Sequence, residues 1–126
     1  MTTPAEVVGV GVAAGVGAPA RYLLDRWVAT RWERVFPWGT FVVNVAGCLL
    51  LGLTIGLVRH DGLSHSWALV LGTGFAGSFT TFSTWILESA RLAEDGSLTE
   101  AGLNLAGSLA AGLLAAGVGL LLAGGG

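Results

Sequence analysis

Nine consecutive residues carry much of the polar chemistry of an otherwise apolar chain. The segment GSFTTFSTW, residues 77–85, holds five hydroxyl side chains and three aromatic rings. Hydroxyl groups donate hydrogen bonds and the edge of a phenylalanine ring is electropositive, so both can contact an anion. The apolar stretches of the chain have no Asp or Glu near their middle, whereas cation pathways usually place carboxylates there. This combination favours a small anion over a cation as the ligand.

The donor set extends beyond this segment into two other apolar stretches. Its members are Asn44, Thr80, Thr81, Ser83, Thr84 and Ser108, together with the ring edges of Phe79 and Phe82. For any single hydroxyl, a bond to its own helix backbone one turn back is the simpler interpretation. The anion hypothesis therefore depends on the cluster and not on one member.

Four long apolar stretches must position these donors. The chain has 126 residues, of which 53% are hydrophobic and 11% charged, and its mean hydropathy is +0.75, which is typical of a membrane protein. The stretches cover residues 4–24, 38–58, 66–90 and 101–123, each with the roughly 20 residues that a helix needs to cross the hydrocarbon core. Barrel strands would be about 10 residues long, with alternating polarity. The sequence predicts an all-α membrane protein, a single domain over residues 1–126 with four transmembrane helices.

The third stretch contains a predicted interruption. Gly72, Gly74 and Gly77 precede the hydroxyl cluster, at about the depth of the membrane midplane. Non-helical backbone at this depth is tolerated where it is buried in protein or lines a cavity, and it exposes backbone groups that can bind ions. We therefore expect the third helix to be broken near its middle. The alternative is a straight helix whose glycines form a packing face.

Small and polar residues recur every four positions on two of the predicted helices. They are Thr40, Asn44, Cys48, Gly52 and Gly56 on the second, and Asn104, Ser108, Gly112 and Ala116 on the fourth. Such faces are expected to meet another helix.

Two other functions are excluded by the sequence. Residues 72–77 match the GxGxxG pattern of dinucleotide sites, but that fold needs alternating strands and helices, which this chain lacks. The charged residues lie in short loops and form no basic patch, so nucleic-acid binding is not expected.

The arginines are distributed unevenly between the linkers. With four spans, Arg21, Arg26, Arg31, Arg34 and Arg91 fall on one side and only Arg59 on the other. The positive-inside rule places the first and third linkers in the cytoplasm and both termini outside. The tryptophans are interpreted first as anchors at the membrane interfaces, at positions 27, 32, 38, 67 and 85.

Three motifs in this order resemble the Fluc (CrcB-like) fluoride channels. They are GAPARY at 17–22, PWGTFVVNVAGCLLLG at 37–52 and GTGFAGSFTTFSTW at 72–85. The resemblance covers essentially the whole chain, and the third motif is the most specific. It implies a dual-topology, antiparallel dimer with two pores, which passively exports fluoride across the cell membrane and limits fluoride toxicity. It implies no catalytic step and no enzymatic activity.

The resemblance also implies roles for individual residues. Asn44 would line the pore, and Phe79 and Phe82 would offer their ring edges to a dehydrated fluoride ion. Arg21 would stand near a pore entrance. Backbone carbonyls of Gly74 and Gly77 would hold a structural Na⁺ at the dimer centre. The remaining fluoride-pathway residues are the hydroxyl side chains of Thr80, Thr81, Ser83 and Ser108.

Several alternatives stay open. The chain has Asn104 where the family often has Tyr, and Gly112 where a Ser can occur, so the polar pathway is expected to differ here. Without Arg21 the arginine bias is four to one, which hints at a heterodimer with an oppositely oriented paralogue; an antiparallel homodimer is the first choice. The rival functions are a small proton-coupled multidrug exporter, which would need a carboxylate inside the membrane, and a structural membrane subunit.

Overall fold

The computed structural model describes residues 2–32 and 36–124, and every regular element among them is a helix. Two long helices come first, α1 (Pro4–Arg31) and α2 (Trp38–His60). The next region consists of α3 (His65–Ala68), the π-helical η1 (Leu69–Ala76), α4 (Gly77–Phe79) and α5 (Phe82–Glu94). The last consists of α6 (Leu98–Gly102), the π-helical η2 (Leu103–Gly107) and α7 (Ser108–Gly124).

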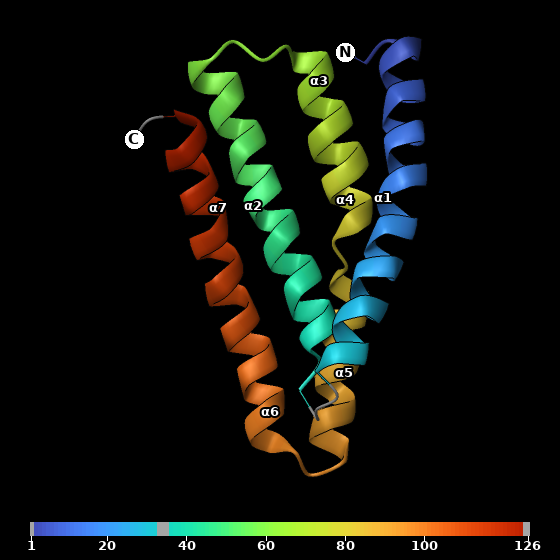
Figure 1. The fold of residues 1–126 in the computed structure, drawn as a ribbon, viewed down its shortest axis with the longest axis vertical. Helices are drawn as coiled ribbons and strands as arrows, with labels where there is room; N and C mark the ends of the chain where they lie inside the picture. Colours follow the sequence, from blue (N-terminus) through green and yellow to red (C-terminus); the bar gives the residue numbers. More distant parts are fainter. Residues whose placement is uncertain (1, 33–35, 125–126) are drawn as a thin grey trace.

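The helices pack side by side into one bundle. Figure 1 shows α2 between α7 on one side and the α3–α4 region on the other, with α1 beyond it. The start of α1 and the end of α7 lie at the same end of the bundle, while the turn between α5 and α6 lies at the other. The chain turns at Asp61–Gly62 and at Asp95–Gly96, where Gly62 and Gly96 have positive φ angles of 72° and 82° that glycine adopts readily.

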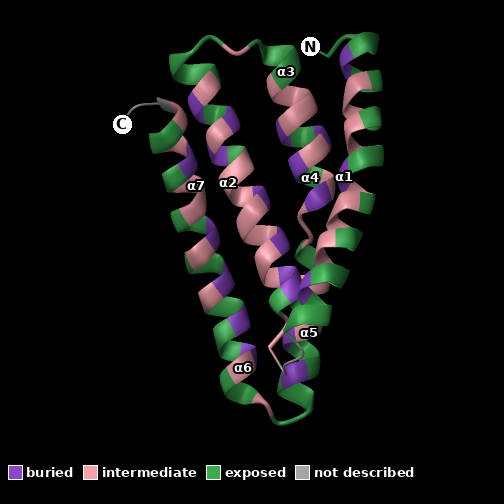
Figure 2. Cartoon of the chain, viewed as in Figure 1, coloured by how far each residue is buried: buried purple, intermediate pink, exposed green. Residues whose placement is uncertain are grey.

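Among the described residues, three helical segments are long and apolar enough to cross a membrane: Pro4–Arg31, Trp38–His60 and Leu98–Ala123. They contain the first, second and fourth predicted spans. The surface agrees with this, because most large apolar residues point outward and are exposed, including Leu114 and Leu122 at 71% and 70%. Figure 2 shows the buried residues confined to the inner faces of the helices. A chain with so much apolar surface is suited to lipid.

The third predicted span is assembled from several segments. The backbone is helical from His65 to Phe79, and it turns extended at Thr80 (φ −78°, ψ 160°) and Thr81 (φ −144°, ψ 118°) before α5 begins. The non-helical residues therefore lie within the motif at 72–85, but after Gly74 and Gly77, which are themselves helical.

Gly74 lies in helical backbone that packs closely against α1. A Cβ at Gly74 would lie 2.8 Å from the Cβ of Ala13 and 2.9 Å from the carbonyl oxygen of Val10. The packing-face interpretation thus describes Gly74 better than a break does. The tight contact compensates for the low intrinsic helix propensity of glycine.

The sequence predicts that the small-residue faces of α2 and α7 each meet another helix, and in the structure they meet each other. A Cβ at Gly112 would lie 3.1 Å from Sγ of Cys48. A Cβ at Gly52 would overlap the backbone of Ala116, and one at Gly119 would overlap the carbonyl of Leu49. The absence of these side chains lets the two backbones approach closely.

Candidate functional site

The amide of Asn44 joins α2 to the extended backbone between α4 and α5. Nδ2 of Asn44 donates to the carbonyl oxygen of Thr81 at 3.0 Å, and Oδ1 accepts from the N–H of Thr81 at 2.8 Å. Both backbone groups of Thr81 are thus satisfied although this residue lies outside a helix. The amide nitrogen of Asn44 has two hydrogens, and the bond to Thr81 uses one, so a second donor remains.

Thr81 also starts the following helix. Its Oγ1 accepts from the backbone N–H of Thr84 at 3.3 Å, which is an N-cap bond, and donates to Oγ1 of Thr84 at 3.1 Å. The hydroxyl of Thr80 points the other way and donates to the carbonyl of Ala76 at 2.9 Å. Thr80 therefore forms the bond to its own helix backbone that is the simpler interpretation for any single hydroxyl in the sequence.

A groove of about 300 Å³ runs beside this break. Asn44 lines it on α2, and Gly77, Thr80, Thr81 and Phe82 line it on the α4–α5 side. Five residues that the sequence assigned to the anion pathway or the sodium site therefore come together. The remaining lining residues are Gly47, Cys48, Leu51, Gly72, Ala76 and Trp85.

The two phenylalanine rings lie in different environments. Phe79 is 8% exposed, and its ring stacks on that of Phe75 with centroids 5.5 Å apart. Phe82 is 71% exposed, and its ring meets Trp85 edge-on, also at 5.5 Å. Within one chain only Phe82 lines the groove, and Phe79 packs behind it in the core.

Ser108 belongs to a second polar cluster centred on Asn104. Asn104 is completely buried, and its Oδ1 accepts from the hydroxyl of Ser108 at 3.2 Å. Its Nδ2 donates to Oγ of Ser89 at 2.8 Å and to the carbonyl of Trp85 at 3.4 Å. The indole N–H of Trp85 returns to the carbonyl of Asn104 at 2.7 Å. The cluster connects α5 to η2 and α7.

The bonds of Asn104 use the donors and the acceptor of its side chain. Both amide hydrogens are directed at protein acceptors, and the oxygen receives the Ser108 hydroxyl. Asn104 is therefore a structural connector between helices, and the hydroxyl of Ser108 is committed to it. Trp85 connects the cluster to the groove, because it lines the groove and its indole N–H donates to the carbonyl of Asn104.

Besides Phe79 and Ser108, three predicted residues lie outside the groove lining. Arg21 is half-buried on α1, and Ser83 is exposed at the start of α5. Gly74 is buried against α1, as described above. Gly77, in contrast, is exposed and lines the groove.

The break leaves the carbonyl oxygen of Gly77 without its usual helical hydrogen-bond donor. In a continuous helix the N–H of Thr81 would donate to it, but that N–H donates to Asn44. The carbonyl of Gly74 instead accepts the N–H of Gly77. Of the two predicted sodium ligands, the free backbone oxygen of Gly77 fits a hard cation better. Across residues 2–32 and 36–124, no group of three or more His, Cys, Asp or Glu side chains could hold a metal.

Sequence reasoning missed the inward role of Trp85. It was interpreted as an interfacial anchor, yet its ring lines the groove and its N–H points into the protein. The available signal was its spacing, because Phe82, Trp85 and Ser89 recur at three and four residues and so share one face of α5.

The helical bundle and its long apolar helices define a multi-pass helical membrane protein. Residues 8–120 match the family described as CrcB-like protein, Camphor Resistance (CrcB). The chain belongs to this family.

The matches to its curated relatives cover nearly the whole length of both chains. A Rubrobacter xylanophilus protein named "Fluoride-specific ion channel FluC 1" is 50% identical over 112 residues, covering 89% of this chain and 88% of the relative. A Streptomyces avermitilis protein of the same name is 49% identical, covering 87% and 89%. A Mycolicibacterium paratuberculosis protein named "Fluoride-specific ion channel FluC 2" is 47% identical, covering 98% of both chains.

Proposed function

We propose that this chain is a subunit of a fluoride-selective channel that passively exports fluoride across the cell membrane. Relatives about 50% identical over most of the chain are named fluoride-specific ion channels. The observation in this molecule that carries the proposal is the Asn44–Thr81 contact, which fixes an extended backbone beside a groove lined with hydroxyl and amide groups.

The groove suits a small, strongly hydrated anion. Fluoride must exchange water for other donors as it passes, and a fixed full charge would hold it too tightly for fast release. The second amide hydrogen of Asn44 and the ring edge of Phe82 are weak donors of the required kind. Among the described residues, no acidic or basic side chain lines this groove. Permeation of an anion needs neither a bound catalyst nor a covalent step.

We propose that the working unit is an antiparallel dimer of two such chains with two pores. Two features support it: Phe82 is 71% exposed in a single chain, and the groove that it lines is open on one side. A second chain would cover Phe82 and close the groove. A homodimer is the first choice, and a heterodimer with an oppositely oriented paralogue is the alternative.

In this dimer the region from α3 to α5 acts as one membrane span broken at Thr80 and Thr81, which gives four spans per chain. The unpaired carbonyl of Gly77 would face its counterpart near the dimer centre and there hold a structural Na⁺. The ion would supply positive charge to backbone oxygens that have no hydrogen-bond donor. The carbonyl of Gly77 is the preferred ligand because the N–H of Thr81, its helical donor, bonds to Asn44. The carbonyl of Gly74 is the weaker candidate because it already accepts the N–H of Gly77.

The multidrug exporter is disfavoured by the same groove. Proton-coupled export of a cationic drug needs a carboxylate in the pathway, and the residues that line this groove include none.

A growth experiment tests the function in cells. A bacterium that lacks its own fluoride exporters should survive otherwise toxic fluoride when it expresses this chain, and its internal fluoride should fall. Expression of the folded chain in the membrane without any rescue would contradict export by this chain alone and direct the search to a paired paralogue.

A further inference from the structure

Helix α1 is longer than a membrane crossing requires, and the excess lies at its C-terminal end. The helix has 28 residues, about 42 Å at 1.5 Å per residue, against a hydrocarbon core of about 30 Å. The sequence predicted a span over residues 4–24, and the helix continues to Arg31. About eight residues therefore extend past the core, and they coincide with the arginine- and tryptophan-containing region.

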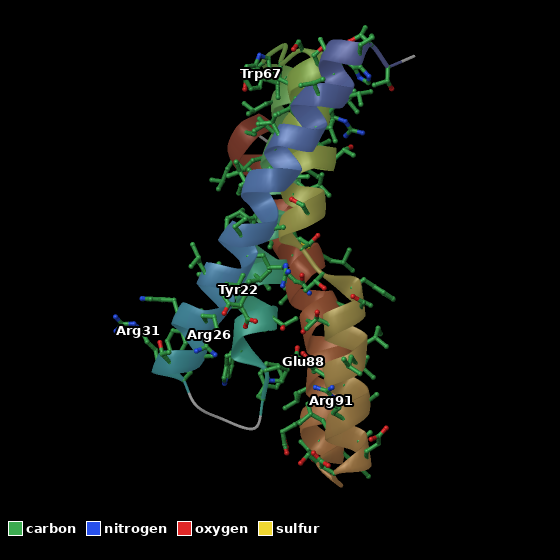
Figure 3. The ribbon with its side chains drawn as sticks, turned by 90° about the vertical axis from the view of Figure 1, so that its right-hand side faces the viewer. Tyr22, Arg26, Arg31, Trp67, Glu88 and Arg91 are labelled. Carbon is green, nitrogen blue, oxygen red and sulfur yellow. The ribbon has the colours of Figure 1, made fainter. Side chains whose placement is uncertain are left out.

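The last turns of α1 carry two neighbouring rows, each with an aromatic ring one turn before an arginine. Residues four apart share a face, so Tyr22 lies below Arg26, and Leu23 and Trp27 lie below Arg31. Tyr22, Leu23 and Trp27 are exposed by 58%, 67% and 51%. Arg26 and Arg31 are exposed as well. Figure 3 shows Arg31 at the outer edge of the molecule, pointing away from the bundle.

The guanidinium of Arg31 is already oriented by its neighbour. Its central carbon lies 4.6 Å from the centre of the Trp27 ring, a cation–π contact. The contact leaves the edge of the guanidinium, with its N–H groups, free to bind an anion. This geometry suits the planar, two-point contact that arginine makes with phosphate.

The one acidic residue of this stretch is turned away from the arginines' surface. Asp25 faces α2, where a Cβ at Gly39 would overlap its carboxylate. The outward face is therefore basic and aromatic, with the carboxylate held in the contact between α1 and α2.

We propose that Tyr22, Leu23, Arg26, Trp27 and Arg31 form a binding surface for anionic phospholipid. The guanidinium groups of Arg26 and Arg31 bind headgroup phosphates, the ring of Trp27 lies at the glycerol level, and Tyr22 and Leu23, about one turn deeper on the helix, contact the start of the acyl chains. The choice of an anionic over a zwitterionic lipid follows from charge complementarity, because within residues 22–31, all of which are described, no outward carboxylate offsets the arginines.

The test measures lipid selection directly and does not depend on fluoride transport. The purified protein is mixed in detergent with equal amounts of phosphatidylglycerol and phosphatidylcholine that have identical chains, and native mass spectrometry counts the retained lipids. We expect a preference for phosphatidylglycerol on the order of tenfold, since each basic residue near a membrane surface contributes a factor of a few.

Two variants locate the surface. Arg26→Gln combined with Arg31→Gln should abolish most of the preference. Arg59→Gln is the matched control, because Arg59 is also exposed but lies at the end of α2, and it should leave the preference unchanged.

Equal retention of both lipids by the unaltered protein would overturn the proposal without any variant. An unchanged preference in the double variant, or an equal loss in Arg59→Gln, would also overturn it. Each of these results is independent of whether the chain conducts fluoride.

Discussion

The side-chain amide of Asn44 pairs with both backbone groups of Thr81, 37 positions further along the chain, at 3.0 and 2.8 Å. A peptide group that leaves a helix inside a membrane needs such a partner, because no water is present to satisfy it. The contact also removes the N–H that would otherwise bond to Gly77. One side chain thus holds the break open and places the polar groups around it.

Replacing Asn44 should therefore affect both folding and transport. Asn44→Ala leaves the N–H and C=O of Thr81 without partners, and we expect a loss of about 1–3 kcal/mol of stability together with a large drop in fluoride flux. Asn44→Asp can still accept from the N–H but can no longer donate to the carbonyl, so its stability should be intermediate. Thermal unfolding in detergent and fluoride efflux from liposomes measure the two effects. Unchanged flux in both variants would contradict the role of this contact.

Asn104 should matter more for stability than Ser108. Asn104→Leu removes three side-chain hydrogen bonds from a buried position, and it leaves the Ser108 hydroxyl without its acceptor and the Ser89 hydroxyl oxygen without its donor. Ser108→Ala removes only one of those bonds. At about 1 kcal/mol per bond, thermal unfolding should show a clearly larger loss for Asn104→Leu. Equal losses would argue that Asn104 is not the centre of the cluster.

Much of this arrangement could be predicted from the sequence. The apolar stretches gave the helices, and the four-residue spacing of small residues predicted that α2 and α7 meet other helices. The position of the break could not be predicted from glycine content, because Gly74 is stabilised in a helix by its contact with Ala13. The break depends instead on Asn44, a partner 37 residues away. Such long-range pairs leave no local pattern.

The close approach of α2 and α7 can be tested with a matched pair of glycines. Gly52→Ala places a methyl group against the backbone of Ala116, which cannot move aside as a flexible side chain would. We expect it to cost about 1–3 kcal/mol, as overpacking usually does. Gly117→Ala is the control, since a Cβ there meets nothing within 4 Å. The account would be contradicted if thermal unfolding showed the same stability for both variants.

A substitution at Phe82 should change fluoride transport without changing the folding of the chain. Its ring is 71% exposed in one chain and contacts Trp85, so Phe82→Ala should leave the secondary structure of the chain intact. If the ring edge contacts fluoride in the assembled channel, flux should fall at least tenfold, because a donor in the pathway is lost. Circular dichroism and liposome efflux together measure this. A Phe82→Ala channel with full flux would remove Phe82 from the pathway.

The most direct measurement is fluoride efflux from liposomes that contain the purified chain alone, with chloride efflux as the selectivity control and Phe79→Ile alongside. We predict fast efflux of fluoride, little efflux of chloride, and loss of the fluoride signal in the variant. Equal release of both ions, or fluoride efflux unaffected by Phe79→Ile, would contradict a fluoride-selective pathway built around this motif.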